Sequence, residues 1–310
     1  MRGKRAAPTR PIAVAALLAA LGLPWISLAQ GPEPRLRIDG EAELFAPDIA
    51  STGHSEIRLT ISPDGRSALW FSRDRPGGAG GYDIWMSRRS GSAWSPAEPV
   101  SFNSAGRDFD PAFSADGRFV YFCSDRPGGL GGDDIYRVSF TARGFGSAVN
   151  LGRHVNSEGD EFAPMLSPDG THLLFSSDRA GGPGGHDLFK ARRAGRAFRP
   201  ARRLEGAINT TANEFDATFL HDGSTIVFAR AMDFRTDRVD LFHAAPVQRE
   251  YGSGTPVAAI NDDRDTYGAM LDWSVPNRLT FSGQRRENGG MDLYVVRYSL
   301  DPRRAGVIRP

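Results

Sequence analysis

Cysteine and lysine are almost absent from this chain of 310 residues, which contains one cysteine, Cys123, and two lysines, Lys4 and Lys190. A single cysteine excludes an intramolecular disulfide and a cysteine-based zinc site. Because Cys123 ends an apolar run that begins at Val120, we expect it to be a small buried residue of a strand. No segment shows the 3.6-residue apolar period of an amphipathic helix. These absences favour an all-β protein without covalent cross-links.

Signatures of common catalytic sites are also missing. The chain has no G-x-S-x-G nucleophile elbow and no H-E-x-x-H metal motif, and its six histidines are scattered one to a loop or strand. The formal net charge is +1, but residues 1–29 contain four basic residues and no acid, so the remainder is mildly acidic. An acidic body has no electrostatic footprint for nucleic acid. The sequence therefore assigns no catalytic residue, no cofactor and no nucleic-acid partner.

The first 29 residues have the three parts of a secretory signal peptide. Residues 1–10 are basic, residues 11–28 are almost wholly apolar, and Ser27-Leu28-Ala29 has small residues at the two specificity positions of a cleavage site. An uncleaved membrane anchor is the alternative, but Pro24 interrupts the stretch, which is short for a span. No cysteine follows it, which excludes a lipoprotein anchor there. We predict a periplasmic or secreted protein with no transmembrane span in its mature chain.

What the chain does contain is an internal repeat. A turn of the Ser-Pro-Asp-Gly type recurs at steps of 52, 53 and 53 residues, and an aspartate followed by an aliphatic and an aromatic residue comes after each turn. In such a turn the aspartate bonds its own backbone and the glycine accepts a positive φ. The fifth unit has residues 273–277 in place of the turn. The turn aspartates are Asp64, Asp116, Asp169 and Asp222, and the aspartates of the second marker are Asp83, Asp134, Asp187, Asp240 and Asp292.

Each unit is predicted to form four short strands, which is the composition of a β-propeller blade. The sequence therefore predicts an all-β, five-bladed β-propeller of four-stranded antiparallel blades, with repeats at about 44–98, 99–150, 151–203, 204–255 and 256–300. Residues 36–44 lie where later units have a fourth strand, so this N-terminal strand should complete the last blade and leave no open sheet edge. The chain is divided into a signal peptide (1–29), one propeller domain (30–303) and a C-terminal tail (304–310).

The units resemble the WD40-like β-propeller repeats of the TolB type. The resemblance rests on Ser-Pro-Asp-Gly, on Phe-Ser-Ser-Asp-Arg and on Gly-Gly-x-Gly-Gly-x-Asp followed by Ile or Leu and an aromatic residue. It covers almost all of the chain after residue 29 and implies the propeller fold, which hosts binding modules and enzymes alike. TolB proteins have six blades and an additional N-terminal α/β domain. This chain has five units and no room for that domain, so the partners of TolB are not carried over.

Acidic residues recur in the loop that enters the first strand of each unit, eight positions before the turn aspartate. Around the mouth of a central channel such carboxylates would attract a cation such as calcium, or a basic side chain of a partner. The alternative is that each carboxylate bonds backbone amides of its own loop. The five acids are Glu56, Asp108, Glu161, Glu214 and Asp265, and five positions earlier stand Ser51, Asn103, Asn156 and Asn209, with Asn261 one position closer in the fifth unit.

The loops between the second and third strands lie on the same face of the predicted propeller, because alternate strands run in opposite directions. We expect Arg75, Arg126 and Arg179 of these loops to pair with neighbouring acids across blades. The aspartates of the second marker should tie the start of the third strand to adjacent backbone. The fourth such loop, residues 230–237, has lost its glycines and is the best candidate for a specialised contact.

Three functions are compatible with these features. The first is an exported binding or scaffold module with a protein or peptide partner, which could be an envelope component. The second is a carbohydrate-active enzyme, a glycoside hydrolase or lyase, that uses acidic residues at the channel mouth. The third is a structural propeller with a central cation.

Overall fold

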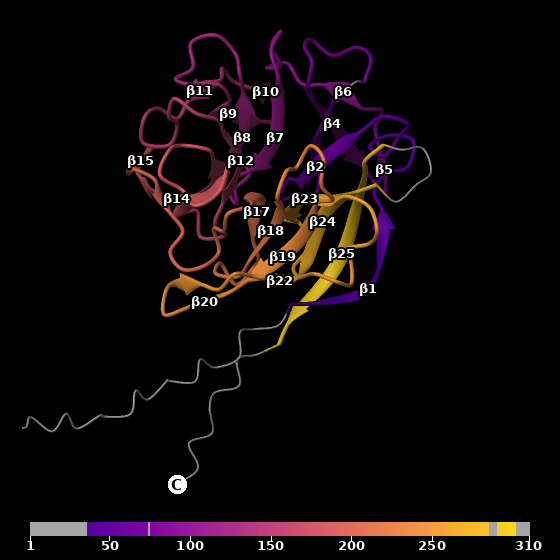
Figure 1. Ribbon diagram of the computed structural model, residues 1–310. Helices are drawn as coiled ribbons and strands as arrows, with labels where there is room; N and C mark the ends of the chain where they lie inside the picture. The colour runs from indigo at the N-terminus through magenta and orange to yellow at the C-terminus, as the bar shows by residue number, and fades with distance from the viewer. Residues whose placement is uncertain (1–35, 74, 285–289, 302–310) are drawn as a thin grey trace, which may run out of the picture. The chain divides into compact units, whose positions relative to one another are not determined.

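The computed structural model describes residues 36–73, 75–284 and 290–301, so the predicted signal peptide and tail lie outside the described residues. Within these ranges the chain forms strands and loops without a helix, and hence no helix that could cross a membrane. Five sheets of four or five strands surround a common centre (Figure 1), and a two-stranded hairpin, β20 (Pro246–Val247) with β21 (Glu250–Tyr251), lies apart from them. The predicted five-bladed, all-β propeller is confirmed.

Three antiparallel strands form the body of each blade, in order from the centre outward. Their runs are rich in β-branched and aromatic residues and are bounded by Gly, Pro and Asp, which is typical of buried strands. The strands are β2 (Glu56–Ile61), β3 (Ser67–Ser72) and β4 (Asp83–Ser90) in blade 1; β7 (Asp108–Phe113), β8 (Phe119–Ser124) and β9 (Asp134–Thr141) in blade 2; β12 (Glu161–Leu166), β13 (His172–Ser177) and β14 (Asp187–Ala194) in blade 3; β17 (Asn213–Phe219), β18 (Ile226–Ala231) and β19 (Asp240–Ala244) in blade 4; and β23 (Thr266–Leu271), β24 (Arg278–Gly283) and β25 (Asp292–Leu300) in blade 5.

The fourth, outer strand is short in four of the blades. It consists of two-residue pieces that pair with the third strand, as expected for the weakest strand of the repeat. These pieces are β5 (Ala93–Trp94), β6 (Glu98–Pro99), β10 (Gly144–Phe145), β11 (Val149–Asn150), β15 (Ala197–Phe198), β16 (Arg202–Arg203) and β22 (Thr255–Pro256).

The ring is closed by the N-terminal strand of the described chain. β1 (Leu36–Leu44) pairs antiparallel with β25, from Leu36 opposite Leu300 to Leu44 opposite Tyr294, and becomes the outer strand of blade 5. The innermost strands contact one another in the order β2, β7, β12, β17, β23, and β23 contacts β2 again. The first and last blades therefore meet, as predicted, and the apolar core lies between adjacent sheets.

The Ser-Pro-Asp-Gly turns have the predicted geometry. In blade 1 the Ser62 hydroxyl donates to Asp64 Oδ1 at 2.6 Å, the Arg66 N–H donates to the same oxygen at 3.0 Å, and Gly65 has a φ of 68°. In blade 5, where the Asp-Gly pair is lost, Asn277 takes the positive φ, at 55°. Asparagine tolerates this conformation better than other residues with a side chain. Cys123 is completely buried, as expected.

Close backbone packing explains the Gly-Gly-x-Gly-Gly loops between the second and third strands. A Cβ atom at Gly182 would lie 1.7 Å from Asp187 Oδ2, so the first glycine pair leaves space for the aspartate of its own blade. A Cβ atom at Gly184 would lie 1.9 Å from the carbonyl oxygen of Ala212, so the second pair leaves space for the backbone of the next blade. Gly78 and Gly80 in blade 1 repeat this arrangement. The glycines are therefore steric requirements of blade stacking.

Candidate binding face

The loops that enter the first strand of each blade and those that join its second and third strands form one face of the propeller, called the loop face below. The acids Glu56, Asp108, Glu161 and Glu214 lie at the start of the innermost strands beneath this face, and all four are completely buried. Each accepts the N–H of the residue four positions earlier in its loop, as the N–H of Thr210 donates to Glu214 Oε2 at 2.9 Å. The described carboxylates thus bond the backbone of their own loops, and a role in ligand binding stays a prediction.

An arginine neutralises each of these acids from the same blade. Arg179 Nη2 lies 3.0 Å from Glu161 Oε1, and Arg126 pairs with Asp108 and Arg75 with Glu56 in the same way. The predicted pairing across blades is wrong. The second strand is paired with the first, so a loop that follows the second strand begins directly beside the acid of its own blade.

Blade 4 has such a pair as well, although its loop has lost the repeat. Arg230 Nε lies 2.7 Å from Glu214 Oε1, and its Nη2 donates to the carbonyl oxygen of Ile208 at 3.0 Å. The guanidinium also lies over the ring of Phe242, 4.7 Å from its centroid. Arg230 lies in β18, whereas the arginines of the other three blades lie in the loop that follows the second strand. Alignment of the loop motifs therefore does not show that Arg230 is their counterpart.

The prediction that Asp265 is the fifth member of the acid ring is wrong by one residue. Thr266 pairs with Gly283 as Glu161 pairs with Ser177, so Thr266 has the equivalent place in blade 5. Threonine carries no charge, and a ring of five carboxylates therefore does not exist among the described residues. Asp265 instead accepts the N–H of Val239, in the preceding blade, at 3.0 Å.

The asparagines five positions earlier join each blade to the one before it. In blade 3, Asn156 accepts the N–H of Ile135 at 2.9 Å and donates to its carbonyl oxygen at 3.0 Å. The side-chain amide thus makes the two hydrogen bonds that a neighbouring strand would make to one residue of the third strand in the preceding blade. Asn103, Asn209 and Asn261 make the same two bonds to Ile84, Leu188 and Leu241. Asn261 stands five positions before Thr266, so this spacing was the signal in the sequence for the correct register.

The aspartates at the start of the third strands have the bracing contacts that the repeat predicts in blades 1 and 2. Asp83 accepts the N–H groups of Ala79 and Gly80 at 3.0 and 3.1 Å, and Asp134 accepts that of Leu130 at 2.5 Å. In the later blades arginine takes part. Arg203 Nε lies 3.1 Å from Asp187 Oδ2, and Arg238 pairs with Asp240. Asp292 is buried at the equivalent position in blade 5.

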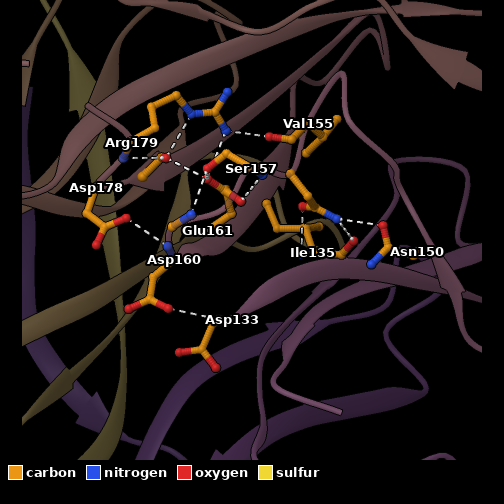
Figure 2. Close-up of polar contacts among 12 residues, drawn as sticks. Asp133, Ile135, Asn150, Val155, Ser157, Asp160, Glu161, Asp178 and Arg179 are labelled. Atoms are coloured by element: carbon orange, nitrogen blue, oxygen red, sulfur yellow. Dashed lines mark hydrogen bonds and ion pairs between the residues drawn. The ribbon is translucent and has the colours of Figure 1, made fainter. Parts of the chain in front are cut away.

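The loop face is asymmetric at the residue just before the acid of the first strand and just before the aspartate of the third strand, because these residues differ from blade to blade. In blade 3 these residues are Asp160 and His186, and Asp178 follows the end of β13, so the three side chains gather at one edge of the blade. Figure 2 shows Asp160 between Asp178 and Asp133 of the preceding blade. The N–H of Asp133 donates to Asp160 Oδ1 at 2.8 Å, and the N–H of Asp160 donates to Asp178 Oδ1 at 2.7 Å. Asp160, Asp178 and His186 are called the blade-3 cluster below.

Asp133 is itself nearly buried beside this cluster. Burial raises the pKa of its carboxyl to about 7, and Arg107 opposes this shift through an ion pair of 3.0 Å, while Asp160 and Asp125 add to it. The sequence analysis missed Asp133, Asp160 and Asp178 because it searched for residues that recur. The signal in the sequence was variation between the units, since the residues just before Glu161 and Asp187 change from blade to blade.

The irregular fourth loop exposes apolar side chains on the same face. Met232 is 64% exposed and Phe234 39% exposed, and with Val149 they are the large hydrophobic residues that are exposed within the described ranges. Phe234 contacts the rings of His186 and Phe215, each with a centroid distance of 5.6 Å. The loop singled out by its loss of glycine therefore borders the blade-3 cluster.

A buried ion cluster occupies the centre of the ring, and the sequence analysis did not predict it. The innermost strands each have a bulge at which one residue takes a positive φ, at Arg58, Asp110, Ala163, Asp216 and Gly268. Arg58 is completely buried and lies 3.7 Å from Asp110 Oδ1 and 3.4 Å from Asp216 Oδ1. Burial raises the pKa of both carboxyls, Asp216 adds to the shift of Asp110, and Arg58 opposes it. A guanidinium of the chain itself thus lies between two buried carboxyls at the centre of the ring.

A shallow pocket of about 280 Å³ on the loop face lies where blades 2 and 3 meet. It includes two of the residues that the sequence analysis selected, Asn156 and Arg179. Its lining residues are Leu130, Arg153, Asn156, Ser157, Glu158 and Arg179.

No family model and no curated protein matches the sequence. Several solved structures match the fold. An α-L-arabinofuranosidase from Lactobacillus brevis has 9% identity and a TM-score of 0.55, covering 80% of this chain and 93% of that one. A thermostable family-43 glycoside hydrolase has 8% identity and a TM-score of 0.51, covering 82% and 91%. TolB from Acinetobacter baumannii has 14% identity and a TM-score of 0.47, covering 80% of this chain and 56% of that one, so the chain spans little more than half of that protein.

At these identities the structural similarity shows the propeller architecture alone. The two glycoside hydrolases have unrelated sequences on the same fold, and a fold does not imply a function. The structure therefore shows a five-bladed β-propeller, and the likeness of its repeat motifs to TolB-type repeats stays a resemblance.

Proposed function

We propose that this chain is an exported β-propeller that binds a protein or peptide through the loop face, at the surface formed by the fourth loop and the blade-3 cluster. The observation that carries the proposal is the position of Met232 and Phe234. Two of the three large hydrophobic side chains exposed in the described part of the chain lie on the fourth loop, which departs from the repeat. Exposed apolar side chains that lie together, with polar residues around them, mark interaction sites.

The charge of this surface indicates the chemistry of the partner. Glu161 and Glu214 beneath the face are buried and paired with Arg179 and Arg230, so they offer no free charge to a partner. Asp160 and Asp178 have no arginine partner within the described residues, and Asp178 is exposed. A partner segment with an apolar side chain next to a basic one fits this combination, because opposite charges favour encounter and register while the apolar contact supplies affinity.

Export supports a partner outside the cytoplasm. The basic start, apolar stretch and small-residue site of residues 1–29 are the motive for this part of the proposal. We infer a periplasmic or secreted location and an envelope-associated partner. Cleavage after Ala29 is tested by sequencing the N-terminus of the protein recovered from periplasm, which should begin at Gln30.

The binding proposal is tested by capture from periplasmic extract with the wild-type chain and with the Met232→Ser/Phe234→Ser variant. The wild type should retain a protein that the variant loses, and the retention should fall as salt rises. Val149→Ser is the matched control, because Val149 is equally apolar and 51% exposed but lies on the outer strand β11 of blade 2. Equal capture by all three proteins, or capture by none of them, would contradict the proposal.

A carbohydrate-active enzyme is the second candidate, favoured by the carboxylates of Asp133, Asp160 and Asp178 around one point of the loop face. Glycoside hydrolysis uses a pair of carboxyl groups on either side of the scissile bond. The same variants separate the two functions. Hydrolysis of arabino-oligosaccharides by the wild type that is abolished in Asp160→Asn and Asp178→Asn, and kept in Met232→Ser/Phe234→Ser, supports the enzyme. No turnover by the wild type supports the binding module.

A further inference from the structure

We propose that the blade-3 cluster, Asp160, Asp178 and His186, is a binding site for a divalent transition-metal ion such as Zn²⁺ or Mn²⁺. Each residue offers one ligand atom, and these atoms all lie within 4.8 Å of one another. Metal–ligand bonds to carboxylate oxygen and imidazole nitrogen are about 2.0–2.2 Å, so small side-chain rotations bring the three atoms around one ion. The ligands come from the adjoining ends of β12, β13 and β14, which are rigidly paired.

The neighbouring blade shows that this place suits a cation. The pairing within each blade shows which positions of blades 2 and 3 are equivalent. Arg107 has the place of Asp160, Asp125 that of Asp178 and Asp133 that of His186. In blade 2 the guanidinium of Arg107 lies 3.0 Å from both Asp125 and Asp133. Blade 2 thus has a cation built into its chain.

Blade 3 has an acid where blade 2 has that arginine. Among the described residues, neither Asp160 nor Asp178 is in an ion pair with a basic side chain. The nearby charge of Arg107 reaches Asp160, but that guanidinium is in ion pairs with Asp125 and Asp133. Two adjacent carboxylates repel each other, and a bound metal ion would supply further positive charge. The other blades lack this set at the same three positions, with Ser55, Arg73 and Tyr82 in blade 1 and Asn213, Ala231 and Val239 in blade 4.

Hydrogen bonds from backbone N–H groups hold one oxygen of each carboxylate in place and leave the other oxygen available to a ligand. Asp160 Oδ1 accepts the N–H of Asp133 at 2.8 Å, and Asp178 Oδ1 accepts the N–H of Asp160 at 2.7 Å. In both residues Oδ2 has no hydrogen bond within the described chain. A carboxylate that is anchored through one oxygen and presents the other is oriented in the way that metal ligands require.

The imidazole of His186 is oriented in the same manner. Asn213 Nδ2 donates to the carbonyl oxygen of Met232 at 2.7 Å, and its Oδ1 accepts the N–H of His186 at 3.0 Å, so the amide orientation is determined. Nδ1 of His186 lies 3.1 Å from that Oδ1 and must therefore be the donor. The neutral ring then has its lone pair on Nε2. Metal-binding histidines characteristically donate their other N–H to such an oxygen.

The donor set selects the class of ion. Ca²⁺ and Mg²⁺ prefer oxygen ligands alone, whereas imidazole nitrogen together with carboxylate oxygen suits Zn²⁺ and Mn²⁺. Three protein ligands leave coordination positions for water or for a side chain of a bound molecule. The site is defined by this chain's own residues and does not depend on the proposed protein partner.

Titration calorimetry of the full chain with ZnCl₂ and MnCl₂ tests the site. The wild type should bind one equivalent, and Asp178→Asn and His186→Ala should each weaken binding at least tenfold. His172→Ala is the matched control, since His172 begins β13 at the opposite end of the strand from Asp178 and should leave the titration unchanged. CaCl₂ should give at least tenfold weaker binding than ZnCl₂. Asn213→Ala, which removes the contact to Nδ1 together with the bonds to the His186 N–H and the Met232 carbonyl oxygen, should weaken binding about 10–100-fold.

Asp160→Arg places an arginine where blade 2 has Arg107, beside Asp178 as Arg107 lies beside Asp125, and keeps the test informative if a neutral variant unfolds. This variant should fold, with an unchanged circular dichroism spectrum, and should not bind the metal. Co²⁺ added to the wild type should give visible absorption bands that are lost in Asp160→Arg and His186→Ala. The proposal is overturned if the wild type shows no saturable binding of Zn²⁺ or Mn²⁺, or if the blade-3 variants bind as tightly as His172→Ala.

Discussion

The side-chain hydroxyl of Ser51 bridges the backbone of Leu293, which lies 242 residues further along the chain. The hydroxyl donates to the carbonyl oxygen of Leu293 at 3.3 Å and accepts its N–H at 3.1 Å. These are the two bonds that asparagine makes at the other four blade junctions. Ser51 is completely buried, and it thus joins blade 1 to blade 5 at the point where the ring closes.

Replacing Ser51 should therefore weaken ring closure. We expect Ser51→Ala to lower the free energy of unfolding by about 1–3 kcal/mol, because two buried backbone groups of Leu293 lose their partner. Ser51→Asn should retain at least the stability of the wild type, since it restores the contact of the other junctions. Urea unfolding measures both changes. Ser299→Ala is the control, because the Ser299 hydroxyl bonds the exposed Asp39 on the outer edge of blade 5. An equal loss of stability in that variant would argue against a special role of Ser51 in ring closure.

Removal of the central guanidinium should be among the most destabilising single changes in the protein. Arg58→Met leaves Asp110 and Asp216 buried without their cation, and breaking a buried ion pair in this way costs about 3–5 kcal/mol. Guanidinium chloride unfolding at pH 8 should show the loss. The triple variant with Asp110→Asn and Asp216→Asn should recover most of it, because the remaining groups are neutral. A triple variant no more stable than Arg58→Met would show that the effect is one of packing and not of charge.

The stability of the propeller should depend on pH through Glu56. Burial raises the pKa of this carboxyl from 4.5 to about 7 in the folded protein, although hydrogen bonds from Thr52 and the charge of Arg75 oppose the shift. The folded state therefore holds the proton more tightly than the unfolded chain. The stabilisation is complete below about pH 4.5, and at most about 3 kcal/mol is lost as the pH rises through 7.

Thermal unfolding between pH 4.5 and 8 measures this dependence on Glu56. Glu56→Gln mimics the protonated carboxyl, so the fall in stability over this range should become shallower in that variant. Identical slopes in Glu56→Gln and the wild type would show that Glu56 does not titrate there.

The glycines of the loops should be coupled to the aspartates of the third strands. Gly182→Ala places a methyl group against Asp187 and should lower the free energy of unfolding by about 1–3 kcal/mol. Asp187→Ala alone should have an effect of similar size because Arg203 loses the buried carboxylate that lies 3.1 Å from its Nε. In the double variant the two losses should not add, since the clash needs the carboxylate. Gly81→Ala, where a Cβ meets nothing within 4 Å, is the control, and strictly additive losses would contradict the coupling.

The sequence alone predicted the architecture because a propeller repeats one local design. The spacing of Asp64, Asp116, Asp169 and Asp222 defines the blades, and the segment before Glu56 could be placed as the closing strand since the repeat leaves one strand missing. It also placed Asn156 and Arg179 on the loop face, where both line the pocket between blades 2 and 3. Each of these predictions depends on contacts within one blade or between neighbours in the repeat.

The sequence could not predict which groups neutralise one another at the centre and on the loop face. Arg58, Asp110 and Asp216 come from three different blades, and they meet because the ring brings the same bulge of each strand to its centre. Asp160 is separated from Asp178 by β12 and β13, and Asp178 from His186 by a loop, and pairing of β12, β13 and β14 brings the three side chains together. Repetition along the chain determined the blades, whereas the sites arise where the repeat varies, and strand pairing within a blade together with closure of the ring decides which varied residues become neighbours.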